Sequence, residues 1–362
     1  MSDHSFSKSE TANKILIRLP NWVGDAVMAI PALRELRRIF RESQITLVGR
    51  PWVLGLFVGE GLADHTITIE DSNRALDRCA RFLSETDRYR RERFDWAVLL
   101  TNSFATALAA WAGRAKTVAG YPTDSRKLLL DYVVPFQPGY KTLHQVNYYL
   151  NIAAQVEIAI AGRSSVDFER CEPRLDSPSD TNPGLELLER FGIDALTAQR
   201  GILAINPGAT NSTAKRWPAE RFAKTADQFS DAYGFQTVII GTAGDKPVAL
   251  QVAELMRGQP TVIAGETSIA DLKALLRCVK LVISNDTGTS HVSAALGVPT
   301  VVVFGPTEHV VTRPLSDSAI VVRHDVECSP CMLRECPIDH RCMTRVEVDD
   351  VYTAARALLA PS

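Results

Sequence analysis

Three polar segments contain the residue types that a group transfer from a diphosphate needs, and each follows a short apolar run. The first is PNWVGD, residues 20–25. Gly24 permits a tight turn between a strand and a helix, and Asp25 falls at or near the start of that helix. Asp25 can act there as a helix cap or as a base that accepts a proton from a substrate hydroxyl. The residues alone leave both interpretations open.

The second segment, NPGATNSTAKRWP at residues 206–218, is a polar loop that leads into a predicted helix. Its hydroxyl and cationic side chains are donors suited to a diphosphate; they are Thr210, Ser212, Thr213, Lys215 and Arg216. The spacing is not that of a Walker loop, which requires G-x-x-x-x-G-K-[ST]. The alternative is a solvated turn that carries a basic pair.

The third segment, SNDTGTSH at residues 284–291, precedes an alanine-rich helix. Gly288 lets backbone N–H groups approach a ligand, and the positive end of the helix attracts an anion. Thr287 adds a hydroxyl donor, and His291 is either a packed residue or a ligand contact. No D-x-D pair occurs in the sequence, so Lys215 and the helix end, rather than a divalent cation, would supply the positive charge.

The elements that must hold these segments alternate between strands and helices. The first half predicts strands at residues 14–19, 44–49, 65–69, 94–100 and 117–120, with a helix over 25–40. The second half predicts strands at 202–206, 236–240, 261–264, 281–284 and 300–304, with a helix over 218–233 and a capping box at Ser268 and Asp271. Strands joined through helices form parallel sheets, whose carboxyl ends bind ligands.

Length and composition favour a soluble protein of two domains. At about 150 residues per domain, 362 residues give two cores, and 46% hydrophobic with 23% charged residues is an ordinary globular balance. The net charge of −2 argues against a generic nucleic-acid binder. Residues 1–13 lack the apolar core of a signal peptide, and no apolar run approaches the length of a membrane span. We therefore expect a loose tail and a cytoplasmic location.

Four cysteines lie close together near the end of the chain, at Cys328, Cys331, Cys336 and Cys342. Four thiolates can surround a structural zinc ion. A zinc ribbon usually has two C-x-x-C knuckles, however, and only one is present. Structural zinc, packed free thiols and disulfides all remain open.

The chain resembles the ADP-heptose:lipopolysaccharide heptosyltransferases of glycosyltransferase family 9. The motifs that carry the resemblance are WVGDAVMAIPAL, NPGATNSTAKRWP, SNDTGTSHVSAALGVPTVVVFGPT and the late cysteine cluster, in that order. The resemblance covers nearly all of residues 14–359 and is greatest to the heptosyltransferase II branch. It implies an α/β protein of GT-B fold, in which two Rossmann-like parallel-sheet domains face each other across a cleft.

The resemblance also implies a role for each matching residue. Asp25 corresponds to the catalytic base, Lys215 to the phosphate-binding lysine, and Thr210 to a phosphate-contacting hydroxyl; Ser212 remains a phosphate-binding candidate from the residues of its loop alone. In the third segment Asp286 would contact the heptose, Thr287 and Gly288 the diphosphate, and His291 the donor. Asp245 stands where some relatives have a glutamate on the adenosine ribose, so its assignment is weaker.

The implied reaction is an inverting, metal-independent transfer of heptose from ADP-L-glycero-D-manno-heptose to the inner-core heptose of lipopolysaccharide. The acceptor would be a Kdo–lipid A-type glycolipid of the inner membrane, contacted peripherally, and no nucleic acid is expected. The basic run of Arg88, Arg90, Arg91 and Arg93 is either a solvated helix end or a contact with phosphorylated lipid headgroups. Ser103, Arg126 and His144 are acceptor-side candidates. The alternatives are a heptosyltransferase I or another family 9 enzyme with a different acceptor, and an inactive scaffold or zinc-ribbon binding protein.

The resemblance and the changes in composition together suggest domain boundaries. We expect an acceptor-binding domain at residues 14–175, a linker at 176–200 and a nucleotide-sugar-binding domain at 201–345. A closing helix within 346–362 would pack back on the first domain. No cofactor is expected to be required for catalysis.

Overall fold

The chain divides into two compact units, unit 1 at residues 1–171 and unit 2 at residues 172–362. The computed structural model describes residues 12–70, 75–176, 183–210 and 212–360. Most of the predicted tail, residues 1–11, therefore lies outside the described residues. Each unit has a six-stranded sheet, and each unit is described by itself.

Unit 1 is built on a sheet of strand order β3-β2-β1-β4-β5-β6 in which neighbouring strands are parallel. The strands are β1 Lys14–Arg18, β2 Gln44–Gly49, β3 His65–Thr68, β4 Trp96–Leu99, β5 Thr117–Gly120 and β6 Tyr132–Val133. The five strands predicted in this half are confirmed. Because the order reverses between β1 and β4, the loop that leads from β1 to the helix containing Asp25 starts at the point where such folds bind ligands.

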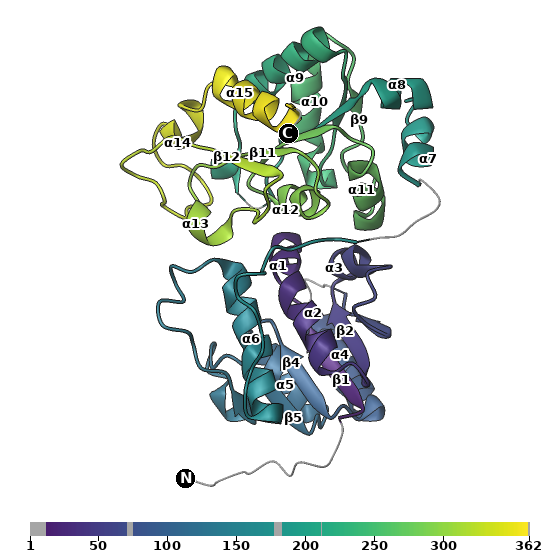
Figure 1. The fold of residues 1–362 in the computed structure, drawn as a ribbon, viewed down its shortest axis with the longest axis vertical. Coiled ribbons are helices and arrows are strands. Elements are labelled where there is room, and N and C mark those ends of the chain that lie inside the picture. The colour runs from purple at the N-terminus through teal and green to yellow at the C-terminus, as the bar shows by residue number, and fades with distance from the viewer. Residues whose placement is uncertain (1–11, 71–74, 177–182, 211, 361–362) are drawn as a thin grey trace. The chain divides into compact units, whose positions relative to one another are not determined.

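The helices of unit 1 are α1 Val23–Met28, α2 Ile30–Ile39, α3 Pro51–Leu54, α4 Ala75–Glu92, α5 Phe104–Ala112 and α6 Gln145–Ala161, with short 3₁₀ turns η1 Gly55–Phe57 and η2 Lys127–Leu129. α2 packs on α6, and α4 packs on α5 (Figure 1). The prediction of one helix over residues 25–40 was wrong. The helix is interrupted at Ala29, because Pro31 has no N–H to donate to Val27 and its ring collides with that carbonyl.

Unit 2 repeats the same plan with strand order β12-β11-β10-β7-β8-β9, again parallel throughout. The strands are β7 Ile202–Asn206, β8 Gln236–Ile239, β9 Thr261–Val262, β10 Leu281–Asn285, β11 Thr300–Val303 and β12 Ala319–Val322. β12 was missed because its short run follows a polar turn. Two sheets with the Rossmann strand order confirm the predicted pair of Rossmann-like domains.

The helices of unit 2 are α7 Pro183–Arg190, α8 Ala195–Arg200, α9 Ala219–Tyr233, α10 Lys246–Leu255, α11 Ile269–Leu276, α12 Gly288–Ala295, α13 His309–Thr312, α14 Arg341–Thr344 and α15 Val348–Leu359, with 3₁₀ turns η3 Thr213–Lys215 and η4 Ala243–Asp245. The capping box of Ser268 and Asp271 at the start of α11 is confirmed. The buried side chains of α15, Val351 and Ala355, belong to the core of unit 2.

The described helices include none that is both long enough and apolar enough to span a bilayer.

Candidate active site

The side chain of Asn285 holds the polar loop between β7 and α9 in unit 2. This loop, residues 207–218, is called the phosphate-type loop. Asn285, fully buried at the end of β10, donates from Nδ2 to the carbonyls of Pro207 at 2.9 Å and Gly208 at 3.1 Å. Its Oδ1 accepts the backbone N–H of Trp217 at 2.9 Å. One side chain thereby holds both ends of the loop. Sequence reasoning passed over Asn285, although it stands inside the third motif.

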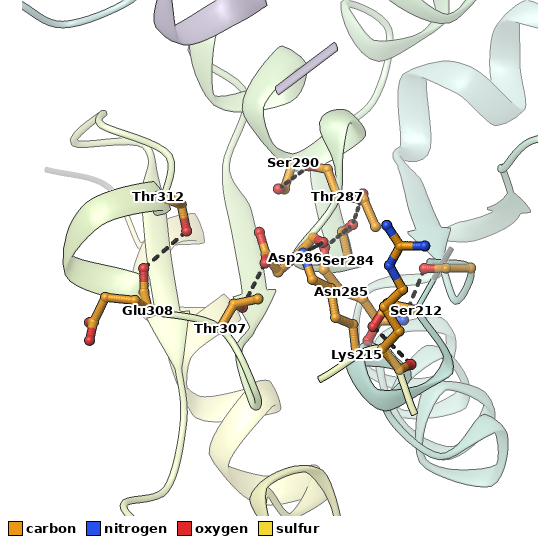
Figure 2. A network of polar contacts seen from close by, with 12 residues as sticks. Ser212, Lys215, Ser284, Asn285, Asp286, Thr287, Ser290, Thr307, Glu308 and Thr312 are labelled. Atoms are coloured by element: carbon orange, nitrogen blue, oxygen red, sulfur yellow. Dashed lines mark hydrogen bonds and ion pairs between the residues drawn. The ribbon is translucent and has the colours of Figure 1, made fainter. Parts of the chain in front are cut away.

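Lys215 and Asp286 form the charged centre of the site. The Lys215 ammonium donates to Asp286 Oδ2 at 2.7 Å and to the Asp286 carbonyl at 3.4 Å. Thr307, in the loop after β11, donates to the same carboxylate oxygen at 2.7 Å. Figure 2 shows Asp286 between these two donors (Figure 2). The pair brings together two of the sequence-predicted residues, and Thr307 is a third partner that was not among the predicted site residues.

The N-terminus of α12 lies beside this pair. Thr287 precedes the helix and makes no side-chain cap hydrogen bond. Its hydroxyl instead accepts from Asn206 Nδ2 at 3.1 Å, and the same amide donates to Thr289 at 2.9 Å. The first N–H groups of α12, from Gly288 onward, are therefore not capped by the preceding side chain, as a helix end that binds an anion requires. His291 is buried one turn into this helix.

The remaining donor-side residues predicted from the sequence differ in burial and in their hydrogen bonds. Thr210 is exposed, whereas Ser212 is buried and donates to the Arg334 carbonyl at 3.3 Å. The Asp245 carboxylate accepts from the backbone N–H of Thr242 at 3.0 Å and from its hydroxyl at 2.6 Å. A Cβ on Gly208 would lie 2.1 Å from Asp245, so residue 208 must be glycine. The buried carboxylate is thus already a helix cap, and its predicted contact with ribose stays a prediction.

The cysteine-containing loop, residues 328–342, contacts the phosphate-type loop through backbone groups. The Arg334 carbonyl accepts the N–H of Ala214 at 3.0 Å, and His340 Nε2 lies 2.6 Å from the Ala214 carbonyl. On the other side, the Pro306 carbonyl accepts the N–H groups of Cys331 and Met332 at 3.1 and 2.9 Å. These contacts join the loop to the segments that carry Lys215 and Thr307.

The four cysteines of this loop line one cavity of about 60 Å³, and all four are free thiols. Burial, together with the neighbouring cysteines, raises the pKa of Cys342 to about 11, so this thiol is protonated at neutral pH. Within the described ranges, no three His, Cys, Asp or Glu side chains are placed to hold a metal ion. Of the three interpretations left open by the sequence, structural zinc at Cys328, Cys331, Cys336 and Cys342 is therefore not supported.

In unit 1 the candidate base is held by a buried tyrosine. Asp25 is the third residue of α1 and not its N-cap, which is Trp22. Tyr149, on α6, donates its hydroxyl to Asp25 Oδ1 at 3.1 Å. Burial, and next the negative charge of Asp25, raise the pKa of Tyr149 well above its usual value, so the phenol remains a donor. Sequence reasoning missed Tyr149 because it lies 124 positions away in an apolar helix.

A buried arginine shapes the loop between β1 and α1. Arg18 donates to the carbonyls of Leu19 at 3.1 Å and Val48 at 3.2 Å, and to Asn21 Oδ1 at 3.3 Å. Burial lowers its pKa. The side chain therefore connects β1, β2 and the start of the loop that presents Asp25.

The three acceptor-side candidates take structural positions at the ends of helices. Arg126 is fully buried and donates to the carbonyls of Tyr121 at 2.8 Å and Ser103 at 3.4 Å, while its second terminal nitrogen is buried without a hydrogen-bond partner. Burial lowers its pKa to about 10, which leaves it charged at neutral pH. His144 caps α6 by accepting the N–H of Val146 at 3.2 Å. The structure brings Arg126 and the Ser103 carbonyl together, and the acceptor-side role of all three residues stays a prediction.

Removing the Tyr149 hydroxyl is expected to slow the sugar transfer that the resemblance implies and to leave nucleotide binding in unit 2 unchanged. A hydrogen bond to a charged group contributes about 1.5–3 kcal/mol, so Tyr149→Phe should lower kcat roughly 10-fold or more through loss of the Asp25 orientation. Steady-state kinetics and ADP calorimetry on the same sample check this. Tyr132→Phe, whose hydroxyl bonds Gln155 at 3.4 Å, is the matched control. Equal kcat values for Tyr149→Phe and wild type would show that the Tyr149 hydroxyl does not orient Asp25 for catalysis.

The sequence profile of glycosyltransferase family 9 (heptosyltransferase) matches residues 85–341. The chain belongs to this family. It is therefore a glycosyltransferase, which confirms the resemblance drawn from the motifs, and its two parallel sheets fit the GT-B fold predicted with them.

Named relatives match nearly the whole chain. The lipooligosaccharide heptosyltransferase 2 of Campylobacter jejuni is 30% identical over 356 residues, covering 96% of this chain and 99% of that protein. The lipopolysaccharide heptosyltransferase 2 of Escherichia coli K12 is 28% identical and covers 86% of this chain and 88% of its own length. The solved structure of Escherichia coli heptosyltransferase II has a TM-score of 0.80 at 24% identity, over 96% of this chain and 98% of that one. The last match shows a shared fold.

Proposed function

We propose that this family 9 enzyme transfers heptose from ADP-L-glycero-D-manno-heptose to the inner-core heptose of lipopolysaccharide, with inversion and without a metal ion. The observation that carries the proposal is the centre in unit 2, where Lys215, Asp286 and Thr307 adjoin the uncapped start of α12. This centre would bind the diphosphate and the sugar of the donor. Unit 1 would bind the acceptor.

The proposed chemistry divides between the two units. Asp25 accepts the proton of the acceptor hydroxyl as the oxygen attacks the anomeric carbon, and the bond from that carbon to the diphosphate breaks on the opposite face. The negative charge that develops on ADP is stabilised by Lys215 and by the positive end of α12. A lysine ammonium has three donors, and the two contacts with Asp286 leave a third for a phosphate oxygen. Attack from the opposite face inverts the sugar configuration.

Removal of divalent cations with EDTA is expected to leave the rate of heptose transfer unchanged. In this proposal the cationic side chain and the helix end replace the acidic pair and divalent cation of metal-dependent transferases. ADP release should therefore proceed at the same rate in excess EDTA as in Mg²⁺. A rate that falls 10-fold or more in EDTA and returns with added Mg²⁺ would contradict the metal-independent mechanism. Product analysis by NMR, with the new linkage opposite in configuration to the donor, tests inversion.

The proposed acceptor class is supported by the relatives that match nearly the full chain, whose names are those of heptosyltransferase 2 enzymes. A heptosyltransferase I, or another acceptor, is the alternative within the family. The substrate is a glycolipid, so we also propose that the protein works in the cytoplasm, at the inner leaflet of the inner membrane.

A further inference from the structure

The helix α5 has an apolar outer face. Its nine residues, FATALAAWA, include one polar side chain, Thr106. The small residues Ala107, Ala109 and Ala110 are buried. Phe104, Leu108 and Trp111 follow at spacings of four and three residues and therefore share one side of the helix. Phe104 is 41% exposed and Trp111 is 55% exposed, whereas a surface helix normally places polar residues there.

Neighbouring elements extend this apolar surface. The turn η2 packs against α5 and contains Leu128, which is 95% exposed. The helix α4 packs along α5, and the two helices meet where Arg90 donates to the Ala112 carbonyl at 3.1 Å. Leu83, two turns before Arg90 on α4, is 65% exposed. Three elements of unit 1 thus present large apolar side chains in one region.

Three cationic side chains lie near the same region, together with one exposed carboxylate, Asp124, which accepts the N–H of Phe104 at 2.6 Å. Arg90 and Arg114 stand at the C-terminal end of α5, where the Arg114 N–H donates to the Trp111 carbonyl at 3.0 Å. Lys127 adjoins Leu128 in η2, and all three cationic residues are exposed. Aromatic rings with adjacent lysine and arginine are typical of a protein surface at the headgroup level of a bilayer, and the positive charge is complementary to anionic lipids. A second copy of the chain would bring like charges together instead.

We propose that the outer face of α5, together with Leu128 and Leu83, docks on an anionic lipid bilayer. Trp111, Phe104 and Leu128 would enter the headgroup region, and Arg90, Arg114 and Lys127 would contact lipid phosphates. The proposal rests in part on the proposed function, since a glycolipid acceptor requires the enzyme to reach a membrane. It assigns that contact to one surface of unit 1.

The test is binding of the full chain to vesicles of phosphatidylethanolamine and phosphatidylglycerol, measured by flotation. Wild type should bind these vesicles and bind pure phosphatidylcholine at least 10-fold less. The variant Trp111→Ser/Leu128→Ser should lose at least 10-fold in binding to the anionic vesicles. Leu196→Ser/Leu255→Ser, at exposed positions of unit 2, is the matched control and should bind as wild type does. Thermal unfolding verifies that both variants are folded.

Three results would overturn the proposal: anionic vesicle binding by Trp111→Ser/Leu128→Ser equal to wild type, no anionic vesicle binding by wild type, or a wild-type dimer that this variant dissociates in sedimentation velocity. An assay of heptose transfer to a delipidated acceptor in solution distinguishes failure of the docking proposal from failure of the proposed function. The variant should retain wild-type turnover with that acceptor and lose it with acceptor embedded in vesicles. Vesicle binding as expected with no transfer to any acceptor would contradict the proposed function and leave the docking surface supported.

Discussion

Replacing Asp25 by asparagine is expected to lower kcat by about 10²–10⁴-fold, the usual contribution of a general base, while ADP affinity stays within about two-fold. The asparagine keeps the shape of the side chain and can accept the Tyr149 hydrogen bond seen at 3.1 Å, but it cannot take a proton. The donor centre belongs to unit 2 and is unchanged. Single-turnover kinetics and ADP calorimetry measure the two quantities separately.

Two controls make the Asp25→Asn result specific. Asp64→Asn removes another partly exposed carboxylate of unit 1, one paired with Arg37 at 2.6 Å, and should retain wild-type turnover. Unfolding temperatures of both variants exclude a folding defect. A folded Asp25→Asn enzyme that turns over at the wild-type rate would exclude Asp25 as the base.

Replacing Lys215 by alanine is expected to weaken ADP binding and slow transfer together. A charge-assisted hydrogen bond contributes about 1.5–3 kcal/mol, which corresponds to roughly a 10- to 100-fold rise in the Kd of ADP. The same change removes the ammonium from the buried Asp286 carboxylate, which keeps its hydrogen bond from Thr307, so the unfolding temperature should also fall. Affinity and rate are therefore measured at a temperature where the variant is fully folded.

The matched control for Lys215 is Lys246, which pairs with Glu266 at 2.8 Å on the surface of unit 2. Exposed pairs of this kind contribute about 0–1 kcal/mol, so Lys246→Ala should change neither ADP affinity nor turnover. Wild-type ADP affinity and turnover in folded Lys215→Ala would mean that the ammonium does not contact the diphosphate.

Local patterns were sufficient to predict most of the fold. Alternating strands and helices gave both parallel sheets, and the capping residues Ser268 and Asp271 marked the start of α11. Pro31 was visible in the sequence, but the prediction of a continuous helix gave the apolar spacing of residues 27–40 more importance than the missing N–H. β12 was missed because four apolar residues after a turn resemble many loops.

The site could be predicted less completely, since its support comes from distant segments. Lys215, Asp286 and Thr287 were found from motifs, and the first two are in direct contact. Tyr149 and Asn285 were missed, because a tyrosine in an apolar helix or an asparagine at the end of a strand has no signature of its own. The cysteine loop is a similar case: it contacts Ala214 through a backbone carbonyl at Arg334, which no residue type could reveal.

The most direct test of the account is a comparison of two acceptors with ADP-heptose as donor, read by mass spectrometry of the glycolipid. Kdo–lipid A that already carries one heptose should gain the mass of one further heptose, and ADP should appear in equal amount. Kdo–lipid A without heptose should react at least 10-fold more slowly. Preferential transfer to the unheptosylated acceptor, or no transfer to either acceptor, would contradict the proposed reaction.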